Sequence, residues 1–478
     1  MKNKKTLHLA IALAISSMPL FGVAEAARGS MYGGESVGDD VTIEASANAY
    51  PTFVGHAFGI YTNVTNSATV TSAGNRLTIT TTGEAGDGIR SNPSGDSNWQ
   101  NATGTINVGD GLTITVSGNS ADGLNINGST VLNIGDNATI NTLYNGELKY
   151  SNGDTSDGAH AVRANFHATI NIGEGLTAGT LGESSHAVYA AHGRSVRNNP
   201  TNGSNINIGK GAVLSTAGKG SHTVMMASNN GKIVIGEDAK MTTLGDGAHG
   251  VAAYADTSGK GSEANGTVEI GAGSTIATAG VFANMTGSVL SLDDNVGITT
   301  EGDASHGLLA QRGVIEAGDG LNISVEGSGS HGAYVNAATG SIEFLGGATI
   351  DNNDNDGYAI YADKGTITGT AGNSTFNITG NMYADNSGSI DLDMDNNSVF
   401  TGSTALANSG TINLNLKNNS YWHVTSSSEV SSLHVSGGSM VNLSYEAGMN
   451  TVVTVDDLSG SGGVFKFNTE LDSEANGD

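Results

Sequence analysis

A short phrase recurs along the chain and constrains its fold more than any other feature. It reads GDGAHGVAAYA at residues 245–255, and variants of it surround five other histidines: His160, His186, His222, His306 and His331. In a last variant, DNDGYAIYADKG, Tyr358 replaces the histidine. A second phrase precedes each copy, for example NINIGKGAVLSTAG from Asn205. Together the two phrases predict a leading strand, a Gly-x-Gly turn, a second strand, another glycine and a third strand.

The period of this pattern is about 26 residues, which indicates a solenoid rather than a globular domain. Three short strands would form one coil, and each coil would stack on the next at about 4.8 Å. A single coil cannot bury its inner face, so stability must come from the neighbouring coils. We therefore expect an all-β fold of roughly 17 stacked coils, about 80 Å long.

The composition supports an ordered solenoid and narrows its partners. The chain of 478 residues has 71 Gly, 4 Pro and no Cys, yet its Val, Ile and Leu alternate with polar residues throughout. That alternation is typical of strands and not of disorder. The net charge of −27, with only 19 Lys and Arg, argues against a nucleic-acid partner because phosphates attract basic patches.

The first residues resemble an export signal. Lys2, Lys4 and Lys5 precede a mostly apolar stretch, and Ala24-Glu25-Ala26 provides a small-x-small cleavage site. We predict a signal peptide at residues 1–26, cleaved between Ala26 and Ala27, and hence an exported protein.

The recurring histidine has two interpretations. One is a metal-binding or pH-sensing ladder, because histidines in adjacent coils would lie close together. The other is a turn residue whose ring hydrogen-bonds a backbone group. The second is favoured, because no Cys or carboxylate accompanies the histidine at metal-site spacing.

The carboxy-terminal segment carries the most specific resemblance. Its pattern of an aromatic-x-Val opening, Leu-x-Val and Val-x-Leu strands, a Leu-x-Gly-x-Gly turn and a closing Phe-x-Phe includes Trp422, Val424, Leu433, Val435, Leu458, Phe465 and Phe467. With the signal peptide and the Gly/Asn/Thr-rich coils, it resembles pertactin-like autotransporter passenger domains of type V secretion.

The resemblance implies a right-handed parallel β-helix, with three strands per coil, displayed on or secreted from a Gram-negative cell. It divides the mature chain into a β-helix start and cap at 27–103, repetitive coils at 104–417 and a folding-nucleating cap at 418–478. Such passengers cross the outer membrane through a β-barrel translocator, but no barrel sequence follows Asp478. We expect the barrel in cis or as a separate product, and a periplasmic location if the chain ends at Asp478.

Three features of the sequence bear on a catalytic or metal-binding role. The stretch SGDSNW at residues 94–99 lacks the second glycine of a serine-protease nucleophile motif and reads as a polar loop. Arg163, Arg194, Arg197 and Arg312 appear isolated or in loops, so no convergent catalytic set is predicted. Calcium-loop offsets occur at Asn352, Asp354, Asp356, Gly357 and Asp363, but without flanking helices and with Asp rather than Glu at the last position.

What remains is a long polar surface. We expect a non-enzymatic protein without a cofactor that acts in adhesion or self-association, with an unknown host or bacterial surface ligand or a second copy as partner. A β-helix enzyme acting on glycans is the alternative, and two carboxylates in catalytic range would favour it. A truncated, non-functional remnant is a third reading.

Overall fold

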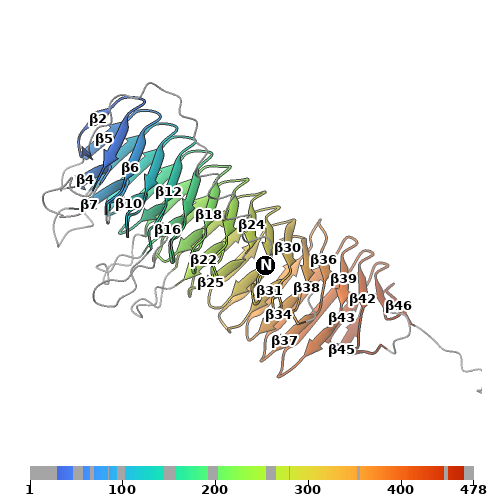
Figure 1. Cartoon of the computed structure of the whole chain (residues 1–478). Coiled ribbons are helices and arrows are strands. Elements are labelled where there is room, and N and C mark those ends of the chain that lie inside the picture. Colours follow the sequence, from blue (N-terminus) through green and yellow to red (C-terminus); the bar gives the residue numbers. More distant parts are fainter. Residues whose placement is uncertain are drawn as a thin grey trace, which may run out of the picture. The chain divides into compact units, whose positions relative to one another are not determined.

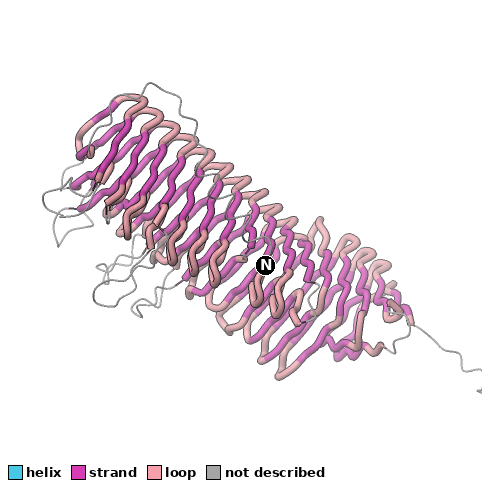
Figure 2. The backbone as a smooth tube through the Cα atoms, viewed as in Figure 1, coloured by secondary structure: helices cyan, strands magenta, loops and turns pink. Residues whose placement is uncertain are grey.

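The computed structural model describes residues 30–46, 58–64, 69–83, 86–93, 103–144, 158–191, 203–254, 265–278, 280–352, 356–445 and 451–467. The predicted signal peptide and its cleavage site, Ala26 and Ala27, lie outside these ranges. The chain forms two compact units, residues 1–293 and 294–478, called here the amino-terminal and carboxy-terminal units. Each is a right-handed parallel β-helix, and the described residues contain strands and turns but no helix (Figures 1 and 2).

The predicted order of strands within one coil is confirmed in the amino-terminal unit, where each strand pairs in parallel with the strand three places later (Figure 1). Its leading sheet contains β2 (Ser36–Val37), β5 (Thr69–Ala73), β8 (Thr103–Val108), β11 (Ser129–Ile134), β14 (Thr169–Ile172), β17 (Asn205–Ile208), β20 (Lys232–Ile235), β23 (Thr267–Ile270) and β26 (Val289–Leu292). Its second sheet contains β3 (Thr42–Ala45), β6 (Thr78–Thr81), β9 (Thr113–Val116), β12 (Thr139–Thr142), β15 (Thr177–Thr180), β18 (Val213–Thr216), β21 (Lys240–Thr243) and β24 (Thr275–Thr278). Its third sheet contains β1 (Met31–Tyr32), β4 (Ile60–Val64), β7 (Ile89–Pro93), β10 (Leu124–Ile126), β13 (Val162–Ala164), β16 (Val188–Ala190), β19 (Val224–Met226), β22 (Val251–Tyr254) and β25 (Val281–Asn284).

The carboxy-terminal unit repeats the same order. Its leading sheet contains β29 (Val314–Ala317), β32 (Ser341–Phe344), β35 (Thr366–Thr370), β38 (Ser389–Met394), β41 (Thr411–Leu416), β43 (Ser428–Val435) and β45 (Val453–Ser459). Its second sheet contains β27 (Gly297–Thr300), β30 (Leu321–Val325), β33 (Ala348–Asn352), β36 (Asn377–Thr379), β39 (Val399–Gly402), β42 (Tyr421–Val424), β44 (Met440–Asn442) and β46 (Val464–Lys466). Its third sheet contains β28 (Leu308–Ala310), β31 (Ala333–Val335), β34 (Ile360–Asp363), β37 (Met382–Asp385) and β40 (Thr404–Leu406).

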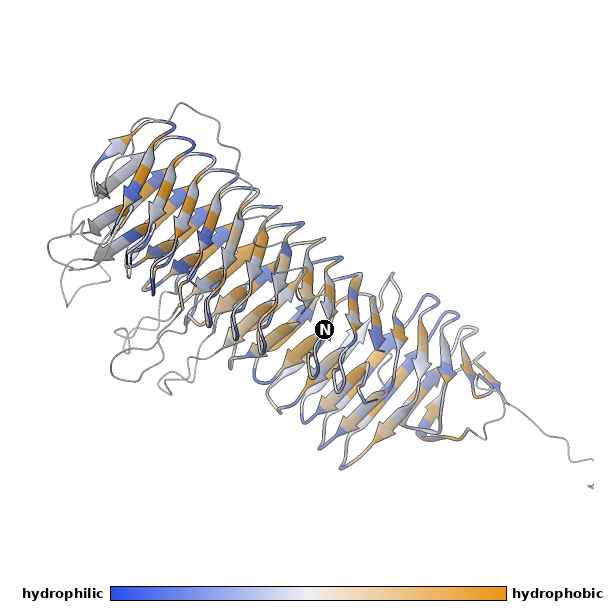
Figure 3. Ribbon diagram, in the orientation of Figure 1, coloured by the Kyte–Doolittle hydropathy of each residue, from blue (hydrophilic) through white to orange (hydrophobic). Residues whose placement is uncertain are grey.

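Alternation within each strand builds the core (Figure 3). Strand β14, TINI, buries Ile170 and Ile172 and turns Asn171 outward. Equivalent residues of successive coils then stack, since Ile170 lies in register with Leu132 on one side and Ile206 on the other. All three are fully buried, so each coil completes the apolar shell of its neighbours.

Two positions of the repeat require glycine for steric reasons. The second glycine of the Gly-x-Gly turn adopts positive φ, for example 71° at Gly175 and 72° at Gly211. The glycine that follows the second strand lies against the backbone of the previous coil, because a Cβ on Gly245 would overlap the carbonyl oxygen of Gly218. Coils can stack at strand spacing only where no side chain intervenes there.

Coils shorten toward the carboxy-terminal end. Bonds between equivalent residues span 25 residues at Ser305 and Ser330, but only 19 at Ser420 and Ser439. After β40, the described chain alternates between the leading and second sheets alone. The segment that resembles the family cap therefore differs structurally from the three-strand coils before it.

Residues of the predicted cap fall into two groups. Trp422 is fully buried, stacks on Phe400 at a ring-centroid distance of 5.7 Å and donates its Nε1–H to the carbonyl of Gly402 (3.0 Å). Val424, Leu433 and Val435 are also core residues. Leu458, Phe465 and Phe467 instead remain 56%, 37% and 60% exposed on the last strands.

Candidate functional site

The recurring histidines form a stack beside the third sheet. Each lies two residues before a third-sheet strand, and His160, His186, His222 and His249 stack at centroid distances of 5.1, 5.0 and 5.3 Å. The Nδ1 atoms of His160, His186 and His222 each accept the backbone N–H of the next histidine, at 3.0, 3.0 and 2.9 Å. The interpretation of the histidine as a ring that hydrogen-bonds the backbone is thus confirmed.

The same position is aspartate in two earlier coils, which the sequence search missed. The backbone N–H of Asp122 donates to Oδ1 of Asp87, and that of His160 donates to Oδ1 of Asp122, both at 2.8 Å. We call this set the acceptor row: Asp87, Asp122, His160, His186, His222 and His249. The sequence does contain a sign of these aspartates. An Asp-Gly pair precedes Ile89 and Leu124, at the position that His-Ala, His-Thr or His-Gly occupies in later coils.

The carboxy-terminal unit has its own acceptor row. His331 donates its backbone N–H to Nδ1 of His306 (3.1 Å), and Tyr358 donates its own to Nδ1 of His331 (3.0 Å). After the first residue of each row, the backbone N–H at this position donates to a side chain of the preceding coil. Because an unpaired buried donor is costly, the requirement for an acceptor explains the repetition of the phrase.

Burial keeps the histidines neutral. It lowers the pKa of His160, His186 and His222 well below the ordinary value, and it lowers the pKa of His306 to about 4. Since Nδ1 accepts a hydrogen bond, the single ring proton of each lies on Nε2. Within the described ranges, no group of three or more His, Asp or Glu side chains is arranged to hold a metal ion.

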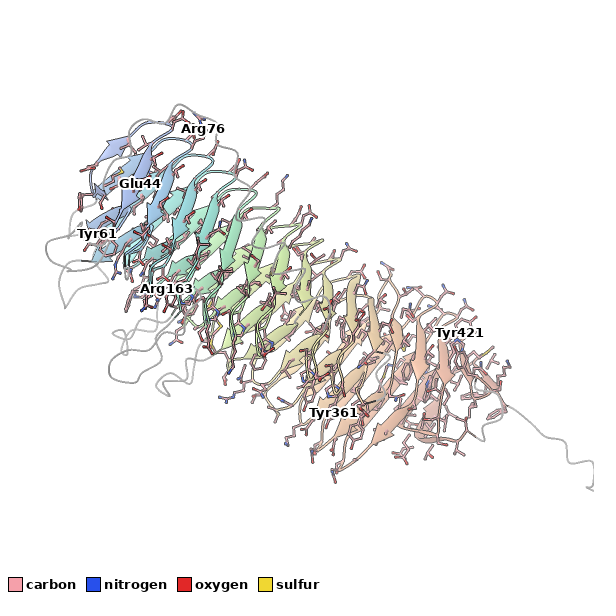
Figure 4. The ribbon with its side chains drawn as sticks, in the orientation of Figure 1. Glu44, Tyr61, Arg76, Arg163, Tyr361 and Tyr421 are labelled. Carbon is pink, nitrogen blue, oxygen red and sulfur yellow. The ribbon has the colours of Figure 1, made fainter. Side chains whose placement is uncertain are left out.

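Next to the acceptor row, side chains that align by register along the third-sheet strands form a second line, which we call the outer row. Its arginines are partly exposed, whereas Asn125 and Met225 are buried. In the amino-terminal unit the register aligns Arg90, Asn125, Arg163, Tyr189 and Met225. In the carboxy-terminal unit it aligns Leu309, Tyr334, Tyr361 and Tyr383. Arg163 and Tyr361 are labelled in Figure 4.

The arginines of the outer row contact the aspartates of the acceptor row. Nη1 of Arg90 lies 2.9 Å from Oδ2 of Asp87, and Nη1 of Arg163 lies 3.6 Å from Oδ2 of Asp122. The side-chain amide of Asn125 also donates a hydrogen bond to Oδ2 of Asp87 (3.2 Å). The prediction that Arg163 is isolated is therefore wrong, because register brings together four charged groups that are distant in the sequence. Of the other named arginines, Arg194 and Arg197 lie outside the described residues, and Arg312 belongs to the carboxy-terminal unit.

The electrostatics of this acid–arginine cluster are unusual. The side chains of Asp87 and Asp122 are 1% and 2% exposed, whereas those of Arg90 and Arg163 are 27% and 19% exposed. Burial raises the pKa of Asp87, and burial opposed by Arg163 raises the pKa of Asp122 to about 8. At neutral pH the Asp122 carboxyl therefore retains its proton, so the two carboxyls do not fully neutralise the two guanidinium groups.

The geometry limits what this cluster can do. Perturbed carboxyls near arginines are a common sign of an active site. Here, however, the carboxyl oxygens face backbone N–H groups and guanidinium groups, and a substrate has no access to them. Only the arginines reach the surface, so the arrangement suits binding of an anion rather than acid–base catalysis.

The tyrosines of the carboxy-terminal outer row stack on one another. Tyr334 and Tyr361 are 4.7 Å apart at their centroids with a 9° angle, and Tyr361 and Tyr383 are 5.2 Å apart. Asp363 and Asp385 end the same strands in register, and Asn386 donates to Oδ1 of Asp363 (2.9 Å). Burial and these carboxylates raise the pKa of Tyr361 and of Tyr383.

The calcium candidates serve separate roles. Asn352 donates its amide to the carbonyls of Ser330 and Tyr358, both at 2.8 Å, and is buried at the end of β33. Asp363 ends β34 in the third sheet, 3.7 Å from Nζ of Lys364, and Asp356 is exposed. Asp354 and the serine-containing stretch 94–99 lie outside the described residues.

No helix within the described ranges is long and apolar enough to cross a membrane.

Comparison of the sequence with models of known protein families and with curated proteins finds no match.

Proposed function

We propose that this chain is a non-enzymatic, exported β-helix that acts in adhesion or self-association at a bacterial surface, as the passenger domain of a pertactin-like autotransporter. One observation supports a binding role over a catalytic one. The recurring histidines and buried aspartates, which are the residues best suited to chemistry, accept backbone hydrogen bonds between coils. Their function is structural, and the outward rows remain for recognition.

Those outward rows are regular and extended, as in other solenoids that bind large partners. On the leading sheet of the amino-terminal unit, the amides of Asn107, Asn133, Asn171 and Asn207 form a ladder with bonds of 2.8 to 2.9 Å. A ladder of this kind fixes the orientation of each amide and leaves a flat, polar surface that contacts a partner over many coils.

The alternative, a glycan-active enzyme, has one point in its favour, the pair Asp87 and Asp122 in adjacent coils. Their burial opposes it, because a catalytic carboxyl must reach the glycosidic bond.

The test uses residues 27–478, purified and coupled to fluorescent microspheres. We expect the spheres to clump or to adhere to bacterial and epithelial surfaces more than spheres carrying albumin. Equal behaviour of the two would contradict the proposal. So would new reducing ends in polysaccharides incubated with the protein, because these would reveal an enzyme.

A further inference from the structure

We propose that the guanidinium groups of Arg90 and Arg163 bind anionic groups of an acidic polysaccharide. This inference rests on the proposed adhesive function and names the chemistry of its partner. Both side chains belong to the outer row of the third sheet in the amino-terminal unit, on β7 and β13, with β10 between them. Two interstrand spacings place them about 10 Å apart.

Both guanidinium groups are held in place before any ligand binds. Arg90 is fixed by Asp87 and lies 5.3 Å from the ring centroid of Phe58. Arg163 donates its Nε–H to Oδ1 of Asn165 (3.2 Å) and lies 5.6 Å from the ring of Tyr189. A side chain that is already held in place loses little conformational entropy when a ligand binds. Most of the favourable interaction energy with an anion therefore contributes to the binding free energy.

The charge of the cluster suits an anion even though the whole chain is strongly acidic. Four ionisable side chains face one another: Asp87 and Arg90 come from one coil, and Asp122 and Arg163 come from the next two coils. His160, which contacts the same cluster, stays neutral. Because Asp122 retains its proton at neutral pH, these four side chains together carry a net positive charge, which reaches solvent through the arginines.

The spacing favours a polymer of moderate charge density. Two fixed cations about 10 Å apart match a chain whose anionic groups recur along it, and a flat sheet accommodates an extended chain. Duplex DNA carries a charge about every 1.7 Å and requires many cationic contacts, which two arginines in a chain of net charge −27 do not provide. We therefore favour an acidic polysaccharide over a nucleic acid.

The experiment measures binding of the immobilised 27–478 chain to polygalacturonate, to fully methyl-esterified polygalacturonate, to heparin and to duplex DNA by biolayer interferometry. We expect polygalacturonate or heparin to bind and the esterified polymer not to bind, and the stronger of the two binders identifies carboxylate or sulfate as the preferred group. Equal binding of the esterified polymer, tighter binding of DNA, or no binding of either acidic polymer would overturn the inference.

Variants of opposite sign sharpen the test. Arg163→Gln should weaken binding about tenfold, as expected for loss of one charge-assisted contact. Asp122→Asn keeps an amide oxygen that accepts the His160 N–H, so it should leave binding nearly unchanged at pH 7 and strengthen it above about pH 8, where the carboxyl of the unchanged chain ionises and competes with the ligand. The control is Arg76→Gln, an exposed arginine paired with Asp40 in the turn between β5 and β6, which should leave binding unchanged.

The double variant Asp122→Asn with Arg163→Gln leaves no buried carboxyl without its arginine, so it should fold and still bind about tenfold less tightly than Asp122→Asn alone. Equal losses for Arg76→Gln and Arg163→Gln would contradict the site. If microspheres adhere but no acidic polymer binds, the inference fails while the adhesive function stands. If neither occurs, both fail.

Discussion

The third sheet carries the same two rows in both units, but with different chemistry. In the amino-terminal unit, aspartates begin the acceptor row and arginines oppose them in the outer row. In the carboxy-terminal unit, His306 and His331 supply the acceptors, and tyrosines take the place of the arginines in the outer row. The ring centroids of Tyr334 and His331 are 4.8 Å apart. Within the amino-terminal unit the change occurs at His160, which Tyr189 contacts at 4.6 Å.

This difference teaches that the backbone fixes the need for an acceptor and the acceptor selects its neighbour. A carboxylate carries charge into a buried position and requires a cation nearby. A neutral imidazole accepts the same hydrogen bond without charge, so an aromatic ring can pack against it. Surface chemistry thus follows from which acceptor a coil uses.

Lowering the pH should have the largest effect on the unfolding free energy, and it should distinguish histidine acceptors from aspartate acceptors. Below about pH 6.5 the unfolded chain protonates its histidines while the folded acceptor row stays neutral, so each histidine lowers the unfolding free energy by about 1.4 kcal/mol per pH unit. Asp87 and Asp122 act in the opposite direction, because their raised pKa values keep protons bound in the folded state.

The double variant Asp87→Asn with Asp122→Asn should lose this compensation. Between about pH 6.5 and pH 4.5, its unfolding free energy should fall more steeply than that of the unchanged chain, by about 1.4 kcal/mol per pH unit from the loss of Asp122, with a further contribution of the same sign from Asp87. Urea unfolding at half-unit pH steps measures the slopes. Parallel slopes would show that the aspartates are not protonated in the folded state.

Removing one arginine should have the next largest effect. Arg163→Met leaves the Asp122 carboxyl without its cation, and above about pH 8, where that carboxyl ionises in the unchanged chain, we expect a loss of unfolding free energy that grows by up to about 1.4 kcal/mol per pH unit. At pH 6 the loss should be much smaller. Thermal unfolding at both pH values measures it, with Arg76→Met as the exposed control, and a loss independent of pH would contradict the titration of Asp122.

An acceptor in the middle of the histidine stack should matter less. His222→Ala leaves the backbone N–H of His249 without its acceptor and should cost about 1–3 kcal/mol. His222→Asn keeps an acceptor oxygen, as Asp122 does naturally, and should recover part of the loss. Hydrogen exchange at the His249 amide reports the bond directly; equal exchange in the two variants would argue against the acceptor role.

The tyrosine stack should give the smallest effect. Tyr361→Leu removes ring contacts with Tyr334 and Tyr383 while keeping an apolar side chain, so we expect a loss of about 0.5–1.5 kcal/mol. Tyr361→Phe is the matched control and should be nearly neutral. A loss as large as that of Arg163→Met would mean that the two outer rows do not differ in kind.

The structure of a single coil could be predicted from the amino-acid sequence. Its period, its alternation of Ile and Val with polar residues, and its glycines at fixed offsets each express a local requirement: strand pleating, positive φ at Gly175, and close backbone approach at Gly245. The lack of a Cys or carboxylate at metal-site spacing also favoured a histidine ring that bonds the backbone, which the structure confirms.

The side-chain contacts between coils could not be predicted from the sequence, because they depend on how the coils stack. Asp122 is bonded by His160, 38 residues later, because inserted segments of variable length separate coils that are nevertheless adjacent in space. Sequence spacing therefore hid the partnership of Arg163 with Asp122. It also hid the burial that raises the pKa of Asp122, because burial depends on neighbouring coils and not on the residues beside it in the chain.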